Sequence, residues 1–495
     1  MKYSRGVRDD EIRRAITGAN PWWRPVAAGA DPTAWMAGHR LLQDRSRYDL
    51  GYRASVLADL ASDAIGDGLV VLTGPRRVGK SVVLVDLAVS LCGRPDVDPR
   101  QIIHLPCDGM AARDLRRALS LGRELTRSVD AEAPRRRVWL LDEISTVPGW
   151  TAILKSGRDG TAFGDDTVVV SGSRWLASED LEGNLLAGRA GSAAHRRIRH
   201  LLPMDFRSFL RATRPELALL DAVHPTELQS PVVREGLEAQ RVDVDAYDLA
   251  WQDYLTCGGF PRAVFEHVRT GQSSDTYLRD LVAGLRREVD PDQPPESIPA
   301  LVSVLSQRAT SPLNVTSTGQ ELGYGRTSFV TRLDRLVSTF AAHWCPHRGE
   351  SGQPVAGSQS KLYLTDPILA WIPSRLRAGL AEPDMTILTE MAVGTALARA
   401  IDELDEGRWV SADTIGYART GSGGEVDLAP IAVPAPAGPV STVPIESKWV
   451  DDGWRREARS IEAKYNSGVV ATKSILDLVH PAWAIPAPLV ALLLG

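Results

Sequence analysis

The chain has 495 residues, a formal net charge of −5 at pH 7, and hydrophobic and charged contents of 43% and 24%. This length excludes a single compact core, so we expect several domains. The composition is typical of a soluble globular protein, and the net charge gives no chain-wide nucleic-acid signature, although it is compatible with a local basic groove.

Residues 1–50 have the pattern of a helical extension ahead of the first domain. Apolar residues recur at helical spacing within residues 10–16. Two adjacent tryptophans, Trp22 and Trp23, follow a proline. They would either form a partner surface or pack onto the next domain, and packing is the interpretation that we favour.

A phosphate-binding loop follows the first predicted strand. Residues 69–73 are apolar and β-branched, as expected of a buried parallel strand, and a mostly apolar helix is predicted from residue 81 onward. The segment between them fits the pattern G-x-x-x-x-G-K-[ST] at every fixed position. Its residues are Gly74, Pro75, Arg76, Arg77, Val78, Gly79, Lys80 and Ser81.

This loop predicts ATP and Mg²⁺ as cofactors. Gly74 and Gly79 let the backbone N–H groups point at phosphate oxygens, and the following helix adds the positive end of its dipole. Lys80 is expected to reach the β- and γ-phosphates, and the Ser81 hydroxyl to bind Mg²⁺.

Two further strands are predicted at 101–106 and 137–141, and the second ends in two acids. Asp142 would hold Mg²⁺ directly or through water. Glu143 lies one residue further out, where it would orient or deprotonate the attacking water. About sixty residues after a phosphate loop, this pair predicts the catalytic half of a nucleotide site.

A fourth strand is predicted at 167–170 and a fifth at 199–204. Ser173, at the end of the fourth strand, would contact the γ-phosphate or the attacking water, and an ordinary strand-end turn is the alternative. Arg189 would serve as an arginine finger or sensor, in cis or in trans, or else form a surface salt bridge. A role in trans would require a homo-oligomer.

Six motifs occur in the order found in one family. They occupy residues 74–81, 140–145, 171–173, 187–189, 202–210 and 254–261. From about residue 50 to its end, the chain resembles bacterial and archaeal AAA-type ATPases that carry a C-terminal uncharacterised domain similar to PD-(D/E)XK nucleases. The last two motifs are the family-specific part, because a phosphate loop alone would not distinguish this family.

The resemblance implies an α/β fold: a P-loop AAA-type ATPase core with a parallel sheet, a helical lid, a winged helix and a C-terminal α/β restriction-endonuclease-like domain. A proline cluster and a Gly/Ser/Gln-rich stretch suggest two of the boundaries. The expected domains are a helical extension, the ATPase core, the lid, the winged helix and the nuclease-like domain, at 1–50, 51–212, 213–290, 291–348 and 349–495.

Three helices and a strand are predicted between residues 300 and 347, and the last two helices have a helix-turn-helix pattern. The third helix carries Arg326, Thr327, Ser328 and Arg332, which would contact DNA. The alternative is that this module serves only as a spacer or a dimer surface.

The resemblance also implies a nuclease-like site after a strand at 361–366. Asp427 and Glu446 would bind one or two Mg²⁺ ions, and Glu390, on a helix, would add a further carboxylate. Lys448 lies on the same strand face as Glu446 and would align or activate the water. Lys464 would contact the scissile phosphate.

The terminal region departs from the family pattern in one place, the Ala/Pro-rich insertion at 432–439, which lengthens the hairpin between the motif strands. The most apolar stretch, 482–494, is shorter than a bilayer span and contains two prolines. The four cysteines form no C-x-x-C pair, and the N terminus is polar. We therefore expect a cytoplasmic protein with no membrane partner.

The favoured hypothesis is an ATP-hydrolysing enzyme that acts on DNA, with a terminal nuclease in defence or genome maintenance. The first alternative is a signal-transducing ATPase whose terminal domain is an inactive scaffold for a protein partner. A third is half of a toxin–antitoxin-like or mobile-element system. Convergence of Glu390, Asp427, Glu446 and Lys448 would favour the nuclease, and dispersal would favour the scaffold.

Overall fold

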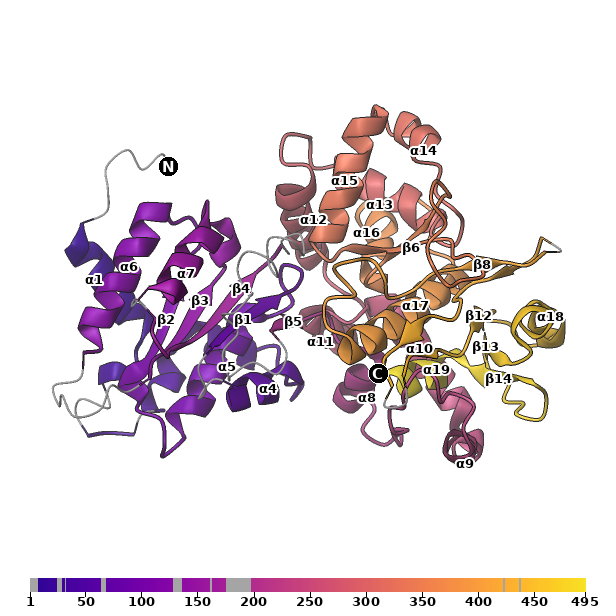
Figure 1. The fold of residues 1–495 in the computed structure, drawn as a ribbon, viewed down its shortest axis with the longest axis horizontal. Coiled ribbons are helices and arrows are strands. Elements are labelled where there is room, and N and C mark those ends of the chain that lie inside the picture. The colour runs from indigo at the N-terminus through magenta and orange to yellow at the C-terminus, as the bar shows by residue number, and fades with distance from the viewer. Residues whose placement is uncertain are drawn as a thin grey trace. The chain divides into compact units, whose positions relative to one another are not determined.

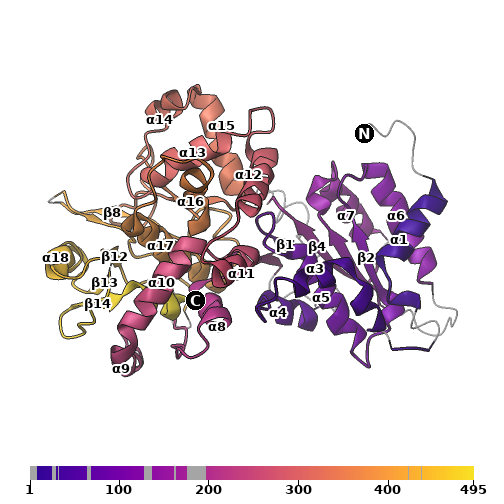
Figure 2. The same cartoon turned by 180° about the vertical axis from the view of Figure 1, so that it is seen from behind.

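The computed structural model describes residues 8–24, 29–31, 33–63, 68–127, 136–160, 163–174, 197–421, 423–435 and 438–495. The chain forms two compact units. The first comprises residues 1–49 and 53–201, and the second comprises residues 50–52 and 202–495 (Figures 1 and 2).

The first unit is built on a parallel sheet with the strand order β2-β3-β4-β1-β5. Its strands are β1 Gly68–Thr73, β2 Ile102–Pro106, β3 Val138–Asp142, β4 Thr167–Gly172 and β5 Ile198–His200. Strands β1, β3 and β4 are buried along their whole length, as expected of parallel strands covered on both faces. The predicted parallel sheet is therefore confirmed.

Helices cover both faces of this sheet (Figure 1). They are α1 Asp9–Ala19, η1 Ala34–Gly38, α3 Arg40–Ser46, α4 Val56–Asp63, α5 Lys80–Cys92, η2 Pro99–Gln101, α6 Ala112–Leu125, η3 Ile144–Thr146 and α7 Trp150–Asp159. Helices α1, α6 and α7 share one apolar core with β1 to β4. Helix α5 packs against the sheet, and α3 and α4 pack against α5.

The N-terminal extension is part of this unit. The indole Nε1 atoms of Trp22 and Trp23 both donate hydrogen bonds to the Ile102 carbonyl, at 3.1 and 2.9 Å. Trp22 is fully buried. The tryptophan pair therefore anchors the extension to strand β2, and the packing interpretation is confirmed.

The second unit begins with helices. These are α8 Phe206–Thr213, α9 Pro231–Ala239, η5 Arg241–Asp243, α10 Val244–Cys257, α11 Pro261–Thr270 and α12 Asp275–Val289. Residues 213–290 are thus largely helical, as their pattern indicated, and their role as a lid stays a prediction.

Three helices and a hairpin follow. They are α13 Ser297–Gln307, α14 Val315–Glu321, α15 Arg326–Ser338, β6 Ala342–Cys345 and β7 Lys361–Leu364. Strands β6 and β7 pair antiparallel, with Cys345 opposite Lys361. Strand β7 was expected to open the last domain, yet it pairs with a strand on the other side of the predicted boundary at 348. The domain boundaries themselves stay predictions.

The terminal residues form a small parallel sheet, two hairpins and the remaining helices. The elements are α16 Pro367–Leu376, α17 Met385–Leu404, β8 Ala418–Arg419, β9 Glu425–Val426, β10 Ala432–Val433, β11 Val440–Ser441, β12 Ile445–Ser447, α18 Trp454–Tyr465, β13 Gly468–Thr472, β14 Ala482–Pro486 and α19 Ala487–Leu494. The sheet order is β12-β13-β14, and β8–β9 and β10–β11 are antiparallel pairs. The alanine- and proline-rich insertion lies at the β10–β11 hairpin.

The two family-specific segments meet in the core of the second unit. The Gly259 carbonyl accepts a hydrogen bond from the Met204 amide at 2.7 Å, and the Gly259 amide donates to the Asp366 carboxylate at 2.8 Å. A Cβ atom on Gly259 would lie 2.0 Å from the Met204 carbonyl oxygen, and one on Gly258 would lie 1.9 Å from Asp366 Oδ1. These motifs therefore form a packing junction. Strand β5 ends at His200, whereas the sequence predicted that it would continue to residue 204.

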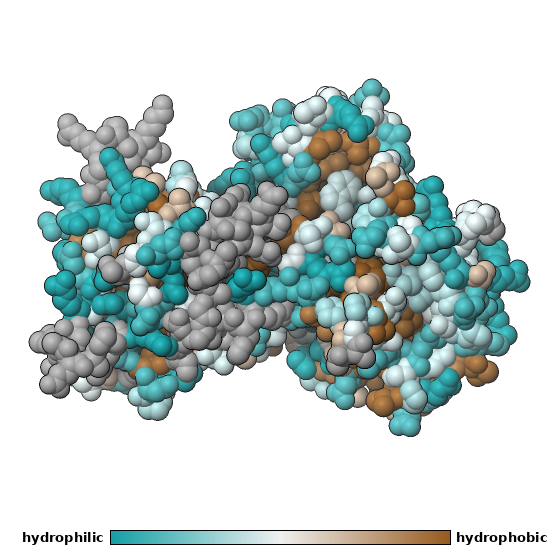
Figure 3. Space-filling view, in the orientation of Figure 1, coloured by the Kyte–Doolittle hydropathy of each residue, from teal (hydrophilic) through white to brown (hydrophobic). Residues whose placement is uncertain are grey.

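Within the described ranges, no helix combines the length and the apolar character needed to cross a membrane. Hydrophilic residues cover much of the face shown in Figure 3, with hydrophobic residues in separate groups.

Candidate ATP site and carboxylate–lysine cluster

The phosphate loop needs glycine at both fixed positions. A Cβ atom on Gly74 would lie 2.0 Å from the Leu201 carbonyl oxygen, so only glycine permits this close approach. Gly79 has a φ of 106° at the start of α5, a conformation that side-chain-bearing residues rarely adopt. The loop between them joins β1 to α5, as the sequence predicted.

Lys80 is the buried cation of this loop. Its side chain is 3% exposed, and its Nζ donates to the carbonyls of Gly74 and Pro75 at 3.0 and 2.9 Å. The same Nζ lies 3.6 Å from Glu143 Oε1. Burial lowers the pKa of Lys80, and the nearby Glu143 and Asp142 carboxylates oppose that shift. The loop lysine and the predicted base therefore occupy one site.

A serine that the sequence analysis missed holds the two acids. The Ser171 hydroxyl donates to Asp142 Oδ1 at 2.6 Å and accepts a hydrogen bond from the Glu143 amide at 2.9 Å. Strand β4 lies between β1 and β3, and the pairing of Leu141 with Val170 places Ser171 beside Asp142. The register of β4 against β3 would have indicated Ser171, whereas the sequence analysis selected Ser173 as the functional serine.

The structure gives only the positions, and not the roles, of the other residues predicted for the nucleotide site. Ser173 is buried at the end of β4, and its sensing role stays a prediction. Arg189 lies outside the described residues. Ser81 is the second residue of α5, one position after Lys80.

These residues fit Mg²⁺–ATP. Glu143 Oε2 is buried and has no hydrogen-bond partner among the residues that the structure describes. A buried oxygen without a partner is costly unless a ligand or water meets it. The loop backbone, Lys80 and Ser81 would hold the phosphates and the ion, together with Asp142 from β3.

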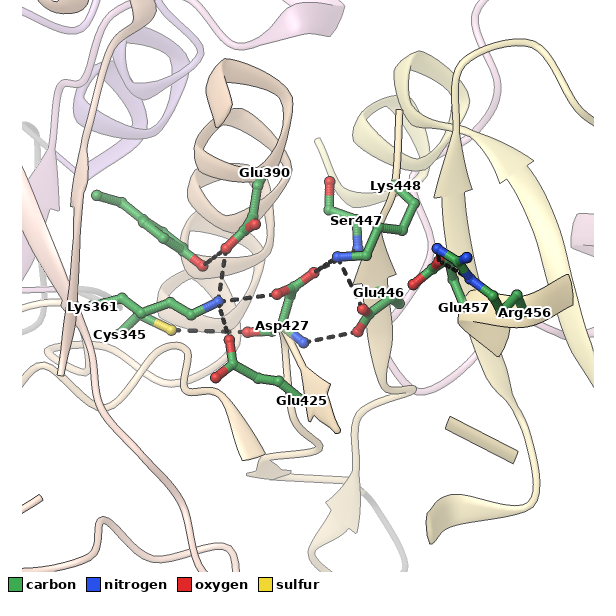
Figure 4. A network of polar contacts seen from close by, with 11 residues as sticks. Cys345, Lys361, Glu390, Glu425, Asp427, Glu446, Ser447, Lys448, Arg456 and Glu457 are labelled. Atoms are coloured by element: carbon green, nitrogen blue, oxygen red, sulfur yellow. Dashed lines mark hydrogen bonds and ion pairs between the residues drawn. The ribbon is translucent and has the colours of Figure 1, made fainter. Parts of the chain in front are cut away.

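In the second unit, three predicted residues of the nuclease-like site lie in contact (Figure 4). The segment that follows β9 pairs with β12, and the Asp427 amide donates to Glu446 Oε2 at 3.1 Å. Lys448 Nζ lies 3.1 Å from Glu446 Oε1 and 3.5 Å from Asp427 Oδ2. Asp427 Oδ2 also accepts the Ser447 amide at 3.1 Å.

A second lysine, which the sequence analysis missed, joins Glu390 to this group. Lys361 Nζ lies 2.9 Å from Glu390 Oε1, 3.0 Å from Asp427 Oδ1 and 2.7 Å from Glu425 Oε1. The Tyr363 hydroxyl donates to the same Glu390 oxygen at 2.6 Å. Polar residues at alternate positions of a buried strand were the available signal. We call the four acids and two lysines, Glu390, Glu425, Asp427, Glu446, Lys361 and Lys448, the carboxylate–lysine cluster.

Burial and mutual repulsion separate the acidities of this cluster. Burial, with the neighbouring Asp427 charge, raises the pKa of Glu390 to about 7 and that of Glu446 to about 8. Burial would also raise the pKa of Asp427, but Lys361 and Lys448 outweigh it and leave that pKa below its usual value. Asp427 is therefore the most acidic of these three groups.

Glu390, Asp427, Glu446 and Lys448 lie in one cluster, but a second lysine, Lys361, lies between Glu390 and Asp427. Across the described ranges, no three histidine, cysteine, aspartate or glutamate side chains are arranged to hold a metal ion. The metal roles of Glu390, Asp427 and Glu446 thus stay predictions. Lys464 Nζ donates to the Arg419 carbonyl at 2.6 Å, and its phosphate-binding role also stays a prediction.

Helix α15 presents only part of its predicted DNA-binding face. Arg332 donates to both carboxylate oxygens of the buried Asp290, at 2.8 and 2.7 Å, and stacks over the Tyr324 ring at 4.0 Å. Its guanidinium therefore holds α15 against the residue that ends α12. Arg326 is exposed, and it donates to the Thr316 hydroxyl at 2.8 Å.

The sheet and the loop define an AAA-type P-loop ATPase domain. Residues 67–210 match a family model described as an AAA domain. Residues 248–376 match a domain of unknown function (DUF8612), whose span crosses the predicted boundaries at 290 and 348. Neither model describes a nuclease. A search of curated proteins found no match.

Several solved structures resemble this chain at low identity. The Walker-type ATPase PABY2304 of Pyrococcus abyssi is 15% identical, with a TM-score of 0.39, over 65% of this chain and 95% of its own. The Thermotoga maritima RuvB Holliday junction branch migration motor is 13% identical, with a TM-score of 0.26, over 62% and 92%. The Aeropyrum pernix ORC2 protein is 12% identical, with a TM-score of 0.29, over 70% and 97%. At such TM-scores these likenesses do not indicate what this chain binds.

Proposed function

We propose that this chain binds Mg²⁺–ATP at the phosphate loop and hydrolyses it. The proposal rests on the two hydrogen bonds by which the Ser171 hydroxyl contacts Asp142 and Glu143. Lys80 Nζ lies 3.6 Å from the Glu143 carboxylate. A metal-binding acid, a base and a phosphate-binding cation are thus brought together at the carboxyl ends of neighbouring strands.

Each side chain would have a distinct task. The loop amides and Lys80 bind the β- and γ-phosphates, and Ser81 and Asp142 hold the ion. Glu143 orients the attacking water and takes its proton. Bound Mg²⁺ neutralises phosphate charge. Ser171 keeps Asp142 and the Glu143 backbone in register, which is a positioning role.

Substitution of Lys80 tests the nucleotide site directly. Lys80→Ala removes the loop cation, so titration with a fluorescent ATP analogue should show a loss of tight binding. Lys155→Ala, which changes a lysine on α7, is the matched control and should bind as the wild type does. Unchanged affinity in Lys80→Ala would contradict the assignment of this loop.

The arginine finger remains part of the proposal, supported by the place of Arg189 in the sequence after Ser173. If Arg189 acts in trans, the protein is a homo-oligomer. A hydrolysis-dead partner that keeps Arg189 should then restore activity to Arg189→Ala. A monomer in light scattering with no rescue in mixtures would exclude the role in trans.

DNA is the proposed macromolecular partner of the second unit. The order of α13, α14, α15, β6 and β7, three helices followed by a hairpin, supports a winged helix in this region. Arg326, Thr327 and Ser328 are exposed at the start of α15. The N-terminal residues of a recognition helix are those that reach base edges and phosphates. The cytoplasm is the compartment in which we propose that this occurs.

The terminal domain has two candidate functions. The contacts of Lys448 with Asp427 and Glu446 favour Mg²⁺-dependent DNA cleavage. The position of Lys361 favours a scaffold without metal chemistry. A panel of linear, nicked, forked and four-way DNA, with Mg²⁺ and with or without ATP, distinguishes them. If the wild type cleaves DNA and Asp427→Ala does not, the nuclease function is established. If both proteins cleave DNA equally, the activity comes from a contaminant.

A further inference from the structure

Lys361 is a fully buried cation that no motif assigns. Its side chain is 0% exposed, and its ammonium group meets one oxygen each of Glu390, Glu425 and Asp427 within 3.0 Å. Figure 4 shows the ammonium group lying between the three carboxylates. An ammonium group has three N–H donors and no acceptor, so these three acids use its whole bonding capacity.

The fold builds this position from several elements. Lys361 lies on β7, Glu390 on α17, and Glu425 and Asp427 on and just after β9. The Tyr417 ring lies 5.4 Å from the Lys361 ammonium, measured to the ring centroid. Lysines near a surface usually extend their charge into water, whereas this one is turned inward. A buried charge persists only where it is paired and hydrogen-bonded.

The oxygens that would bind a metal ion already have protein partners. Asp427 gives one oxygen to Lys361 and the other to the Ser447 amide and Lys448. Glu446 accepts the Asp427 amide with Oε2 and meets Lys448 with Oε1. A divalent ion bound by Glu390 and Asp427 would therefore have to displace Lys361 from their facing oxygens.

We propose that Lys361 is the resident cation of the carboxylate–lysine cluster and that the terminal domain is a metal-independent scaffold. This inference selects one of the two candidate functions of that domain. It stands whether or not the chain hydrolyses ATP, because the two sites lie in separate units.

The test uses the full chain without nucleotide and the ion Mn²⁺ as the probe. Free Mn²⁺ is followed by electron paramagnetic resonance during a titration, and the melting temperature is measured in EDTA and in Mn²⁺. The proteins are the wild type, Asp427→Asn, Lys361→Met, and the double variant Lys361→Met with Asp427→Asn. Lys473→Met is the control for loss of a lysine from the same domain, because Lys473 forms a surface ion pair with the exposed Asp451.

The wild type and Asp427→Asn should bind the same amount of Mn²⁺, so no bound ion depends on Asp427. The melting temperature of the wild type should be equal in EDTA and in Mn²⁺. Lys361→Met should melt at a lower temperature in EDTA and recover in Mn²⁺ with one ion bound, and Asp427→Asn should remove that recovery. Lys473→Met should melt as the wild type does.

Two results would overturn the proposal. One is Mn²⁺ binding by the wild type that Asp427→Asn abolishes. The other is a Lys361→Met protein as stable in EDTA as the wild type. If Lys361→Met fails to fold in either solution, the wild-type titration decides alone. The failure of this proposal would leave ATP binding at Lys80 untouched, so it cannot be confused with failure of the ATPase assignment.

Discussion

The Ser171 hydroxyl and the Asp142 carboxylate lie 2.6 Å apart at adjacent positions of strands β4 and β3. The same hydroxyl accepts the amide of Glu143 at 2.9 Å. One side chain on the central strand of the sheet thus fixes both acids of the nucleotide site. Strand β4, which carries this serine, lies between the loop strand β1 and the acidic strand β3.

Ser171→Ala should slow ATP hydrolysis while leaving nucleotide affinity nearly unchanged. Loss of a hydrogen bond that orients a metal ligand typically costs about 10- to 100-fold in activity. Phosphate release and analogue binding would be measured together. Ser173→Ala, two residues along the same strand end, is the matched comparison. Hydrolysis by Ser171→Ala at the wild-type rate would contradict the positioning role of Ser171.

Gly259→Ala should destabilise the second unit. The added Cβ would lie 2.0 Å from the Met204 carbonyl oxygen, so the backbone junction must shift. Overpacking of this kind typically costs about 1–3 kcal/mol. Gly325→Ala is the control, because its Cβ meets no atom within 4 Å. Equal denaturation midpoints for the two variants in tryptophan fluorescence would contradict the packing role of this motif.

Arg332→Ala should lower the stability of the protein, whereas Arg326→Ala should weaken its binding to DNA. Arg332→Ala leaves the buried Asp290 carboxylate without its cationic partner, and such a loss typically costs about 3–5 kcal/mol of stability. Arg326→Ala should leave the melting temperature unchanged and weaken DNA binding in low salt, because Arg326 is exposed at the start of α15. DNA binding that is identical in wild type and Arg326→Ala would exclude this helix end as the contact.

Glu446 should make the second unit less stable as pH rises. Its pKa is raised from 4.5 to about 8 in the folded chain, so the folded state binds this proton more tightly than the unfolded state does. Its stabilising contribution is complete below pH 4.5 and is lost as pH rises toward about 8. Within that window each pH unit changes the free energy of unfolding by at most about 1.4 kcal/mol.

Glu446→Gln removes the titrating group and should flatten this decline. The pKa of Asp427 is lowered in the folded chain, so its contribution to the free energy of unfolding is lost only when the pH falls below this window. Denaturation midpoints across the window compare the two proteins. Parallel pH profiles would show that Glu446 does not carry the dependence.

Features that depend on residues close together in the sequence were predicted. Several contacts between residues far apart in the sequence were missed. The loop, the strands before it and after it, and the Asp142–Glu143 pair follow from local patterns. Ser171 was passed over for Ser173 because the choice depends on the register of β4 against β3. The convergence of Asp427 and Glu446 was predicted from motif order, and the structure places them in contact.

Lys361 was missed for the same reason. Its strand, β7, was assigned to the start of the last domain, whereas it pairs with β6 and faces α17 and the segment around β9. The alternation of Lys361 and Tyr363 in this strand was a local signal, but the carboxylates that surround the lysine come from other parts of the chain. Likewise, the role of Gly259 became visible only when Met204 and Asp366 were seen on either side of it.

The most direct test of the central claim is ATP hydrolysis by Glu143→Gln. Glutamine keeps the size of Glu143 and loses the base, while Asp142 and Ser81 still provide the predicted ion site. The account predicts ATP binding close to that of the wild type and phosphate release slower by about 10²-fold or more. Phosphate release at the wild-type rate would contradict it.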